Sequence, residues 1–270
     1  MHPILLKIGP LIIHTYGFMM AVGVAFALWF LFAQSKTRGL DANKMADMAF
    51  YTIIISLIGA KLVLFIGDFS YYTHNLQELF MLARSGGVFQ GGLIFGTLFA
   101  LWYVRKQRIP TWKAADIIGP ALALGHGFGR IGCFFAGCCF GRECSEPWGV
   151  TFTSEYAHNL IGIPIKTSYV HPVLHPVQLY ESILNFLNFI VLFLILRKKR
   201  FDGQVFPFYI INYSIIRYIV EFYRGDHPDK AFIIRHPSPY LSLSLPQLFC
   251  ILGLVGGVIL FFILKKRKSA

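Results

Sequence analysis

The stretch ALALGHGFGRIGCFFAGCCFG, residues Ala121–Gly141, places charge inside a segment long and apolar enough to enter a membrane. Arg130 follows His126 by one helical turn, so both side chains lie on one face of a helix. Charged groups within membrane spans are costly, and they usually face a polar interior and mark a substrate or ion path. The stretch therefore predicts a functional site within a membrane-embedded helix. The glycines around Arg130 fit either close helix packing or the approach of a ligand to the backbone.

A second charged face follows in Tyr213–Arg224, YSIIRYIVEFYR. Arg217, Glu221 and Arg224 recur there at i, i+4 and i+7, which places them on one side of a helix. An Arg–Glu pair at this spacing can neutralise itself inside a bundle, but the third charge is positive and in excess. Two arginine-rich faces predict an anion held at bilayer depth, and the guanidinium fork suits a phosphate.

Composition indicates an all-α polytopic membrane protein. The 270 residues are 56% hydrophobic and 14% charged, with a mean hydropathy of +0.59. The first apolar run is too long for a signal-peptide core and lacks a small-residue cleavage site, so we expect it to remain as a span. No repeat or linker indicates a second domain, and residues 1–270 are expected to form a single membrane domain. We predict seven spans at about 13–34, 47–67, 88–104, 114–132, 179–196, 205–223 and 247–264.

The net charge of +12 is distributed as an orientation signal rather than as a nucleic-acid surface. By the positive-inside rule, the short basic loops are cytoplasmic, which places the N-terminus outside and the C-terminus inside. The long connection at about 133–177 then forms a small extra-cytoplasmic cap, and the anion site opens toward the outer leaflet. The basic loops contain Lys36, Arg38 and Lys44; Arg105, Lys106, Arg108 and Lys113; Arg197, Lys198, Lys199 and Arg200; and Lys265, Lys266, Arg267 and Lys268.

Polar residues at the starts of other spans are further candidates. Gln90 precedes Gly91 and Gly92 at the start of the third span, and its amide can both donate and accept hydrogen bonds. The fifth span opens with the segment His175–Glu181, HPVQLYE, whose polar side chains fit either substrate binding or helix capping and interface anchoring.

Four cysteines lie at the mouth of the fourth span with the spacing C-x4-CC-x4-C, from Cys133 to Cys144. This spacing lacks the paired C-x-x-C of a zinc site, so we expect no metal site. A disulfide from Cys138 or Cys139 to Cys144 is compatible with an oxidising exterior. Cys250 is expected to be a small buried hydrophobe.

These blocks together resemble bacterial prolipoprotein diacylglyceryl transferases. The resemblance rests on Gly129–Cys133, GRIGC; on Gln90–Ile94, QGGLI; on HPVQLYE; and on the Arg217, Glu221, Arg224 stripe. It implies transfer of the diacylglyceryl group of phosphatidylglycerol to the lipobox cysteine of a preprolipoprotein, the first step of lipoprotein maturation, in the bacterial plasma membrane. The products are a thioether and glycerol 1-phosphate, and no metal or soluble cofactor is implied.

The resemblance also assigns residues. It implies that Arg130 grips the lipid phosphate and that Arg217 makes a second essential contact, with further roles for Tyr16, Glu221 and Arg224. Many members have a histidine, proposed as a base, where this chain has Gln90, and an asparagine where it has Cys133. Glutamine cannot act as a base near neutral pH, so His126 is our substitute, unless no dedicated base is needed. The expected catalytic residues are Arg130, Arg217, His126, Glu221 and Tyr16, and the expected substrate-binding residues are Arg130, Gln90, Gly91, Gly92, Cys133, Arg224, His175 and Gln178.

Two other classes remain as alternatives. A membrane thiol-disulfide oxidoreductase would use the cysteines from Cys133 to Cys144, and an anion or lipid transporter would line a route with the arginine faces. The transporter would need a polar path to the cytoplasmic side, and the cytoplasmic halves of the predicted spans contain few polar residues.

Overall fold

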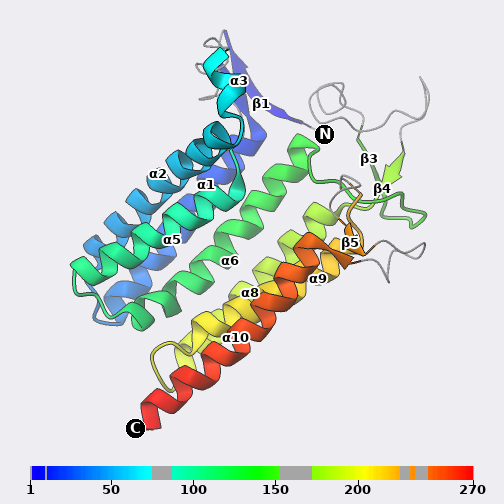
Figure 1. The fold of residues 1–270 in the computed structure, drawn as a ribbon. Coiled ribbons are helices and arrows are strands. Elements are labelled where there is room, and N and C mark those ends of the chain that lie inside the picture. The colour runs from blue at the N-terminus through cyan, green and yellow to red at the C-terminus, as the bar shows by residue number, and fades with distance from the viewer. Residues whose placement is uncertain are drawn as a thin grey trace. The chain divides into compact units, whose positions relative to one another are not determined.

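The chain folds mainly into long helices, and it is described here by a computed structural model. The structure describes residues 2–9, 11–74, 87–152, 172–225, 232–234 and 243–269. The helices are α1 (Thr15–Thr37), α2 (Ala42–Gly67), α3 (Phe69–His74), α5 (Phe89–Lys106), α6 (Thr111–Ala136), α8 (Val177–Lys198), α9 (Val205–Glu221) and α10 (Leu245–Ser269) (Figure 1).

A long helix covers each of the seven predicted spans, with ends that differ from the prediction by a few residues. Among the described residues, four helices are long and apolar enough to cross a membrane: α1, α2, α8 and α10. The prediction of an all-α membrane protein is thus confirmed at this level, while the count of seven spans stays a prediction. The predicted cap at 133–177 is described at 133–152 and 172–177, and its middle lies outside the described residues.

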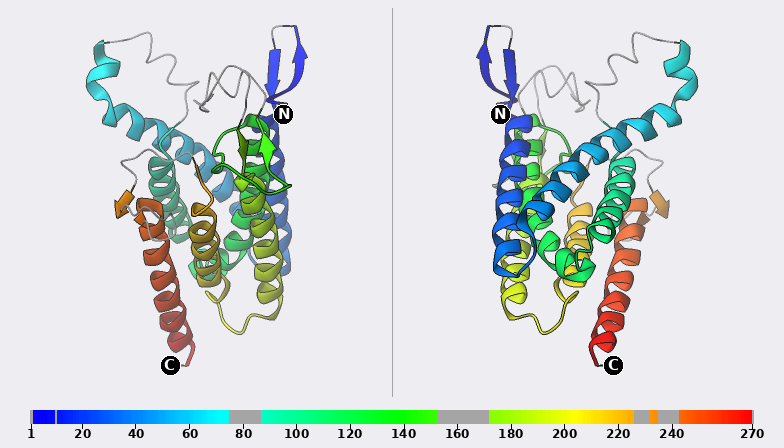
Figure 2. Two further views of the ribbon diagram at one scale, coloured as in Figure 1. Left: turned by 90° about the vertical axis from the view of Figure 1, so that its right-hand side faces the viewer. Right: turned by 90° about the vertical axis from the view of Figure 1, so that its left-hand side faces the viewer.

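Short antiparallel strand pairs accompany the helices and were not predicted from the sequence. The pairs are β1 (Ile4–Ile8) with β2 (Leu11–His14), β3 (Val150–Thr151) with β4 (Val173–Leu174), and β5 (Phe232–Ile234) with β6 (Leu243–Ser244). The β1–β2 hairpin projects beyond the first turn of α1 (Figure 2).

The chain divides into two compact units: residues 1–29 with 115–270, and residues 30–114. In the second unit, α2 packs along α5, and the contact depends on glycine. A Cβ at Gly91 would lie 2.5 Å from the carbonyl oxygen of Gly59 and 2.7 Å from Val63, so only glycine allows this approach.

In the first unit, α6, α8, α9 and α10 make the frame of the candidate site. In this unit, α8, α9 and α10 lie side by side in that order (Figure 1). The helices α6 and α8 are joined by the Ser182 hydroxyl, which donates to the carbonyl oxygen of Gly127 at 2.8 Å. The helices α8 and α9 are joined by Asn212, whose amide donates to the Asn188 side chain at 3.0 Å.

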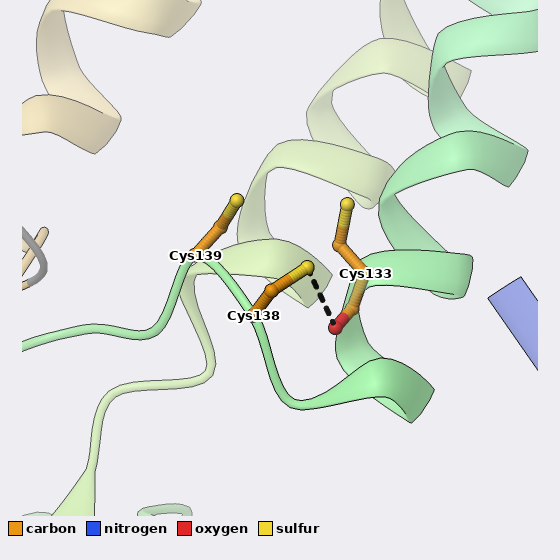
Figure 3. A group of neighbouring side chains, drawn as sticks. All are labelled: Cys133, Cys138 and Cys139. Atoms are coloured by element: carbon orange, nitrogen blue, oxygen red, sulfur yellow. Dashed lines mark hydrogen bonds between the residues drawn. The ribbon is translucent and has the colours of Figure 1, made fainter. Parts of the chain in front are cut away.

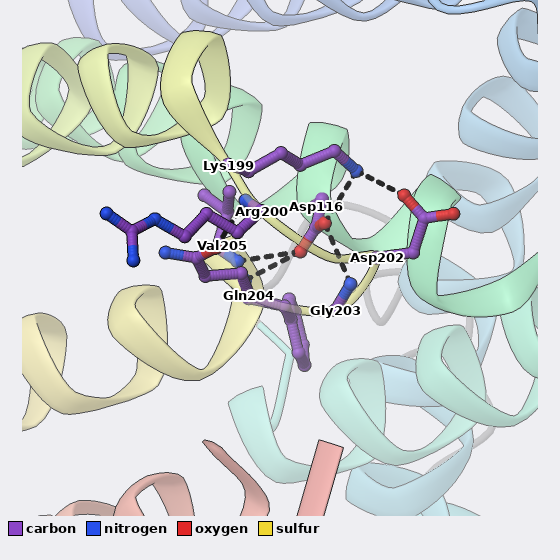
Figure 4. A network of polar contacts seen from close by, with 8 residues as sticks. Asp116, Lys199, Arg200, Asp202, Gly203, Gln204 and Val205 are labelled. Atoms are coloured by element: carbon purple, nitrogen blue, oxygen red, sulfur yellow. Dashed lines mark hydrogen bonds and ion pairs between the residues drawn. The ribbon is translucent and has the colours of Figure 1, made fainter. Parts of the chain in front are cut away.

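A buried carboxylate holds one end of this frame. Asp116, which is fully buried on α6, accepts hydrogen bonds from the backbone N–H groups of Gly203, Val205 and Phe206 at 2.8–3.2 Å. The same carboxylate also forms an ion pair with the Lys199 ammonium at 2.8 Å (Figure 4). The carboxylate satisfies amides at the start of α9 that have no partner within the helix, and it fixes the α8–α9 connection to α6.

Candidate active site

The centre of the site is an arginine on α6 that a glutamate on α8 holds. An Nη of Arg130 lies 3.1 Å from Oε1 of Glu181, and Nε of Arg130 donates to Nε2 of His126 at 3.1 Å. The Glu181 side chain is 2% exposed and the Arg130 side chain 15% exposed, so the pair is largely removed from water. The second Nη group of Arg130 makes no hydrogen bond or ion pair with any residue that the structure describes.

His126 completes a triangle with these two residues. Its Nε2 lies 3.2 Å from Oε1 of Glu181, the same oxygen that Arg130 contacts. One ring nitrogen cannot accept a proton from Arg130 and donate one to Glu181 at the same time. The tautomer that donates from Nε2 to Glu181 leaves the lone pair on Nδ1, whereas the other tautomer uses Nε2 to hold Arg130.

Glu181 belongs to a buried polar face of α8 that includes Gln178, an expected substrate-binding residue, and three residues that the sequence analysis did not assign to the site. The face is made of Gln178, Glu181, Ser182, Asn185 and Asn188, each at most 4% exposed. Their recurrence at helical spacing within an apolar span was the available signal, because polar residues in a span usually face a protein interior. The segment His175–Glu181 was expected to serve either in substrate binding or in helix capping, and the contact of Glu181 with Arg130 was not predicted.

The second charged cluster joins α9 to the start of α10. Nη1 of Arg217 lies 2.5 Å from Oε2 of Glu221, and the Glu221 side chain is 2% exposed. The Ser244 hydroxyl donates to Oε1 of Glu221 at 3.0 Å and accepts the backbone N–H of Gln247 at 3.3 Å. Glu221 is thereby held from both sides, and it orients Arg217.

The two clusters form one electrostatic region. Glu181 interacts with Arg217 as well as with Arg130, and Tyr213 on α9 interacts with both arginines. The rings of His126 and Tyr213 have centroids 5.2 Å apart. Among the described residues, the guanidinium groups of Arg130, Arg217 and Arg224 accompany the buried carboxylates of Glu181 and Glu221. The arrangement suits a bound anion.

Arg224 lies in the loop after α9 that pairs with residues 140–142. Gly141 and Arg224 form an isolated β-bridge, and Nε of Arg142 donates to the carbonyl oxygen of Arg224 at 3.0 Å. A Cβ at Gly141 would collide with the backbone oxygen of His175, so glycine is required where the three segments meet. The structure thus brings Arg224 to the loop that carries the cysteines.

Tyr16 lies on the α1 side of this region. A Cβ at Gly132 would lie 3.2 Å from the ring and 3.2 Å from the carbonyl oxygen of Tyr16, so α1 and α6 approach closely here. The phenol of Tyr16 interacts electrostatically with Cys133 and Arg130. The structure therefore places Tyr16 beside the predicted site.

The side chains of Cys133, Cys138 and Cys139 come together, although Cys133 lies on α6 and the other two lie in the loop that follows it. Their Sγ atoms all lie within 4.8 Å of one another, and Figure 3 shows the three side chains converging between the last turn of α6 and the following loop. Hydrogen bonds from Cys133 and Cys138 lower the pKa of Cys139, and the positive charges of Arg130 and Arg224 act in the same direction, against burial. Cys144 is a free thiol outside this trio, so the structure does not contain the disulfide considered for it.

Gln178 contacts the loop that carries Cys138 and Cys139 rather than the Arg130–Glu181 pair. Its Nε2 donates to the carbonyl oxygen of Cys138 at 2.8 Å, and the side chain is fully buried. The amide of Gln178 thus fixes the loop that presents two of the three thiols.

His175 lies in a separate aromatic pocket. Its Nδ1 is 3.2 Å from the Tyr180 hydroxyl, which also accepts the Trp148 indole N–H at 2.8 Å. The pocket has a volume of about 630 Å³ and is lined by Glu146, Trp148, His175, Tyr180, Leu184, Ile219, Val220 and Tyr223.

Gln90, Gly91 and Gly92 belong to the second unit. Gln90 is exposed at the start of α5, while Gly91 and Gly92 contact α2. Their part in substrate binding stays a prediction.

Comparison with known proteins gives a consistent result over the whole chain. The model of the prolipoprotein diacylglyceryl transferase family matches residues 3–263. The chain is 35% identical to the phosphatidylglycerol–prolipoprotein diacylglyceryl transferase of Clostridium tetani over 269 residues, which cover 100% of both chains. It is 31% identical to the second such enzyme of Clostridium perfringens (100% of this chain, 98% of that one) and 31% identical to that of Bacillus velezensis (83% and 81%).

Proposed function

The chain belongs to the prolipoprotein diacylglyceryl transferase family, and we propose that it transfers the diacylglyceryl group of phosphatidylglycerol to the lipobox cysteine thiol of preprolipoproteins. The products are a thioether-linked lipid and glycerol 1-phosphate. The observation that carries the proposal is the Arg130–Glu181 pair, which holds a guanidinium group in a largely buried position between two helices.

Arg130 binds the phosphate that leaves. The Glu181 carboxylate holds one Nη group of Arg130, so the guanidinium plane is oriented before substrate arrives. The remaining Nη group is directed by that plane and can donate to a phosphate oxygen. Attack of the thiolate on the glycerol carbon increases the negative charge on this phosphate, so a fixed guanidinium stabilises the transition state more than the ground state.

Arg217 supplies the second positive charge. Glu221 and Ser244 position it, and its interaction with Glu181 couples it to Arg130. Arg224 adds a third guanidinium group from the loop after α9. The three arginines together serve as the binding site for an anionic phosphoglyceride.

His126 is the candidate proton acceptor in place of the histidine that Gln90 replaces. With Glu181 accepting from Nε2, Nδ1 of His126 carries a lone pair for a proton. The carboxylate then fixes the tautomer, in the way that a buried acid orients a catalytic histidine. Gln90, Gly91, Gly92, Cys133, His175 and Gln178 serve in substrate binding, and Tyr16 lines the lipid phosphate site from α1.

The chain lies in the plasma membrane with seven spans, an outer N-terminus and a cytoplasmic C-terminus. Large apolar side chains on the helix surfaces support a bilayer environment: Trp29 is 66% exposed, Leu57 62% and Phe262 60%. The basic residues that end α5, α8 and α10 support the orientation. In this orientation Arg130 and Arg224 lie toward the outer leaflet.

Family membership does not favour the two alternatives. A thiol-disulfide oxidoreductase and an anion or lipid transporter both fail to explain the match over residues 3–263.

The direct test uses the purified chain in nanodiscs that contain labelled phosphatidylglycerol, together with a peptide that carries a lipobox cysteine. We expect the peptide to gain one diacylglyceryl group in thioether linkage and glycerol 1-phosphate to be released in equal amount. A peptide with serine in place of the cysteine is the matched control. If the cysteine peptide stays unmodified while the chain is folded, the proposal is wrong.

A further inference from the structure

The three converging thiols have a geometry that the spacing of the cysteines does not suggest. Cys133 lies in the last turns of α6, whereas Cys138 and Cys139 lie in the loop that follows. The loop turns back on the helix at Gly137, whose φ is 78°, and again at Cys139, whose φ is 60°. A non-glycine residue at positive φ is costly, and such strain is retained where the surroundings require it.

Hydrogen bonds hold the turned loop in place. The backbone N–H and the thiol of Cys138 both reach the carbonyl oxygen of Cys133, at 3.2 Å and 3.7 Å. Gln178 on α8 then fixes the carbonyl of Cys138 from the other side. The cluster is therefore positioned by two helices as well as by its own loop.

The distances suit a metal with thiolate ligands. A tetrahedral zinc ion with Zn–S bonds of about 2.3 Å requires sulfur atoms about 3.8 Å apart. The three Sγ atoms lie within 4.8 Å of one another. Side-chain rotations that shorten the Sγ–Sγ distances by up to about 1 Å would therefore bring them to the spacing that zinc requires. Thiolates select soft cations, and three protein ligands with an open fourth position are typical of catalytic rather than structural zinc.

Two positively charged side chains lie near the cysteine trio. Arg130 precedes Cys133 by one helical turn, and Arg130 and Arg224 both interact with Cys139. Three thiolates with a divalent cation have one net negative charge, which these arginines offset. A thiolate cluster without the cation would have three negative charges in a partly buried site.

We propose that Cys133, Cys138 and Cys139 bind one thiophilic divalent cation, for which zinc fits best, and that its open position takes the thiol of the acceptor cysteine. The proposal rests on the transferase function given above. It departs from our expectation of no metal site, which rested on the absence of a C-x-x-C pair. The backbone turns at Gly137 and Cys139 bring the three thiols together without that spacing. It also supplies a means of activating the thiol in a chain with Gln90 at the position of the family's histidine.

The reaction forms one C–S bond and breaks one C–O bond. On binding to the cation, the acceptor thiol loses its proton to His126, the proton acceptor proposed above, and becomes a thiolate, because a coordinating thiol is deprotonated. The thiolate sulfur attacks the glycerol carbon that carries the phosphate, forming the C–S bond. The C–O bond to the phosphate breaks, and its electron pair leaves with the phosphate oxygen near Arg130. No oxidant or reductant is involved.

The first test measures the site without any turnover. The chain, reduced and in nanodiscs without phosphatidylglycerol, is titrated with Co²⁺, which gives an intense near-ultraviolet band when thiolates bind it. We expect one equivalent to bind, with loss of the band in Cys133→Ser and in Cys139→Ser. Cys144→Ala is the matched control, because this thiol lies in the same segment but outside the trio, and it should keep the band. Absence of the band in the parent chain, or an unchanged band in Cys133→Ser, would refute the site.

The second test addresses the open position and the function separately. Adding the lipobox peptide to the Co²⁺-loaded chain should increase the intensity of the near-ultraviolet band, because one more thiolate then binds the Co²⁺ ion. The serine peptide should leave the intensity unchanged. Transfer with phosphatidylglycerol should fall at least tenfold after chelation and recover with Zn²⁺. Equal transfer by metal-free chain would refute the role of the cation and leave the transferase function intact. An unchanged band with the cysteine peptide would refute the open position. If the band responds but no lipid is transferred under any condition, the transferase function fails while the metal site stands.

Discussion

Glu181 on α8 fixes Arg130 on α6 through an ion pair of 3.1 Å, and both side chains are largely buried. The same carboxylate oxygen lies 3.2 Å from His126, so one buried acid orients both the proposed phosphate ligand and the proposed base. The pair thus connects the packing of two helices to the chemistry of the site.

Arg130→Lys should abolish most activity although the charge is kept. Lysine has a compact ammonium group and cannot contact Glu181, His126 and a phosphate with one planar fork. Loss of a charged hydrogen bond that stabilises the transition state costs about 3 kcal/mol, on the order of a hundredfold in rate. The initial rate of lipid transfer measures this, after equal membrane insertion is established. Arg267→Lys, the same change at an exposed position of α10, should leave the rate unchanged. Near-normal turnover in Arg130→Lys would exclude the specific phosphate grip.

Glu181→Gln should lower both turnover and stability. The amide keeps the size of the side chain but leaves the positive charge of Arg130 without its partner, and breaking a buried pair in this way costs about 3–5 kcal/mol. Thermal unfolding in detergent and the initial rate are the measurements. Asp47→Asn removes a charge from an exposed position of α2 and should change neither. A stable and active Glu181→Gln chain would show that Arg130 is oriented by other groups.

Ser244→Ala should lower turnover several-fold without unfolding the chain. The substitution removes the hydroxyl that donates to Glu221 and accepts from Gln247, an interaction worth about 1 kcal/mol. The effect should be smaller than that of Arg217→Lys, because the Arg217–Glu221 pair remains. A loss larger than that of Arg217→Lys would mean that Ser244 itself contacts substrate.

Asp116→Asn should destabilise the chain by about 3–5 kcal/mol and leave the transfer rate per folded molecule unchanged, because it removes one partner of a buried ion pair. Asp202→Asn is the matched control. Asp202 also pairs with Lys199, but its side chain is 53% exposed, and exposed pairs contribute under about 1 kcal/mol. Equal thermal midpoints for the two variants would argue against a stabilising role for the Asp116 contacts.

Reporter fusions test the orientation. Fusions after Lys44, Arg108 and Arg200 should be cytoplasmic, and a fusion after Lys166 should be external. Lys166 lies outside the described residues, so this prediction rests on the sequence alone. A cytoplasmic signal at Lys166 would reverse the orientation and place the site toward the other leaflet.

Hydropathy predicted the positions of the long helices because an apolar run of sufficient length leaves few other structures open to a chain in lipid. It did not predict the β1–β2 hairpin, since Ile4–Ile8 and Leu11–His14 are short apolar runs, and the second of them overlaps the start of the first predicted span. Helix ends were also uncertain by a few residues, because local contacts set them.

The site was predictable where helical spacing determines proximity. Arg130 with His126, and Arg217 with Glu221, are neighbours on their own helices, and both contacts are present. Contacts between elements were not predictable in this way. Glu181 meets Arg130 through the packing of α6 against α8, and the thiols converge through backbone turns at Gly137 and Cys139 that the spacing does not encode.

The buried polar face of α8 also constrains the order of events as the chain enters the bilayer. A charged residue exposed to lipid costs up to about 2.5–3.5 kcal/mol at mid-bilayer, and Glu181 lies in the second turn of α8 on its buried polar face. During synthesis α6 emerges before α8, so Arg130 and the Gly127 carbonyl are already present when Glu181 and Ser182 arrive. Asn188, in contrast, can form its hydrogen bond with Asn212 only after α9 has also emerged. The contacts that build the site thus favour release of α8 into lipid beside α6, which makes the site a determinant of the chain's own biogenesis.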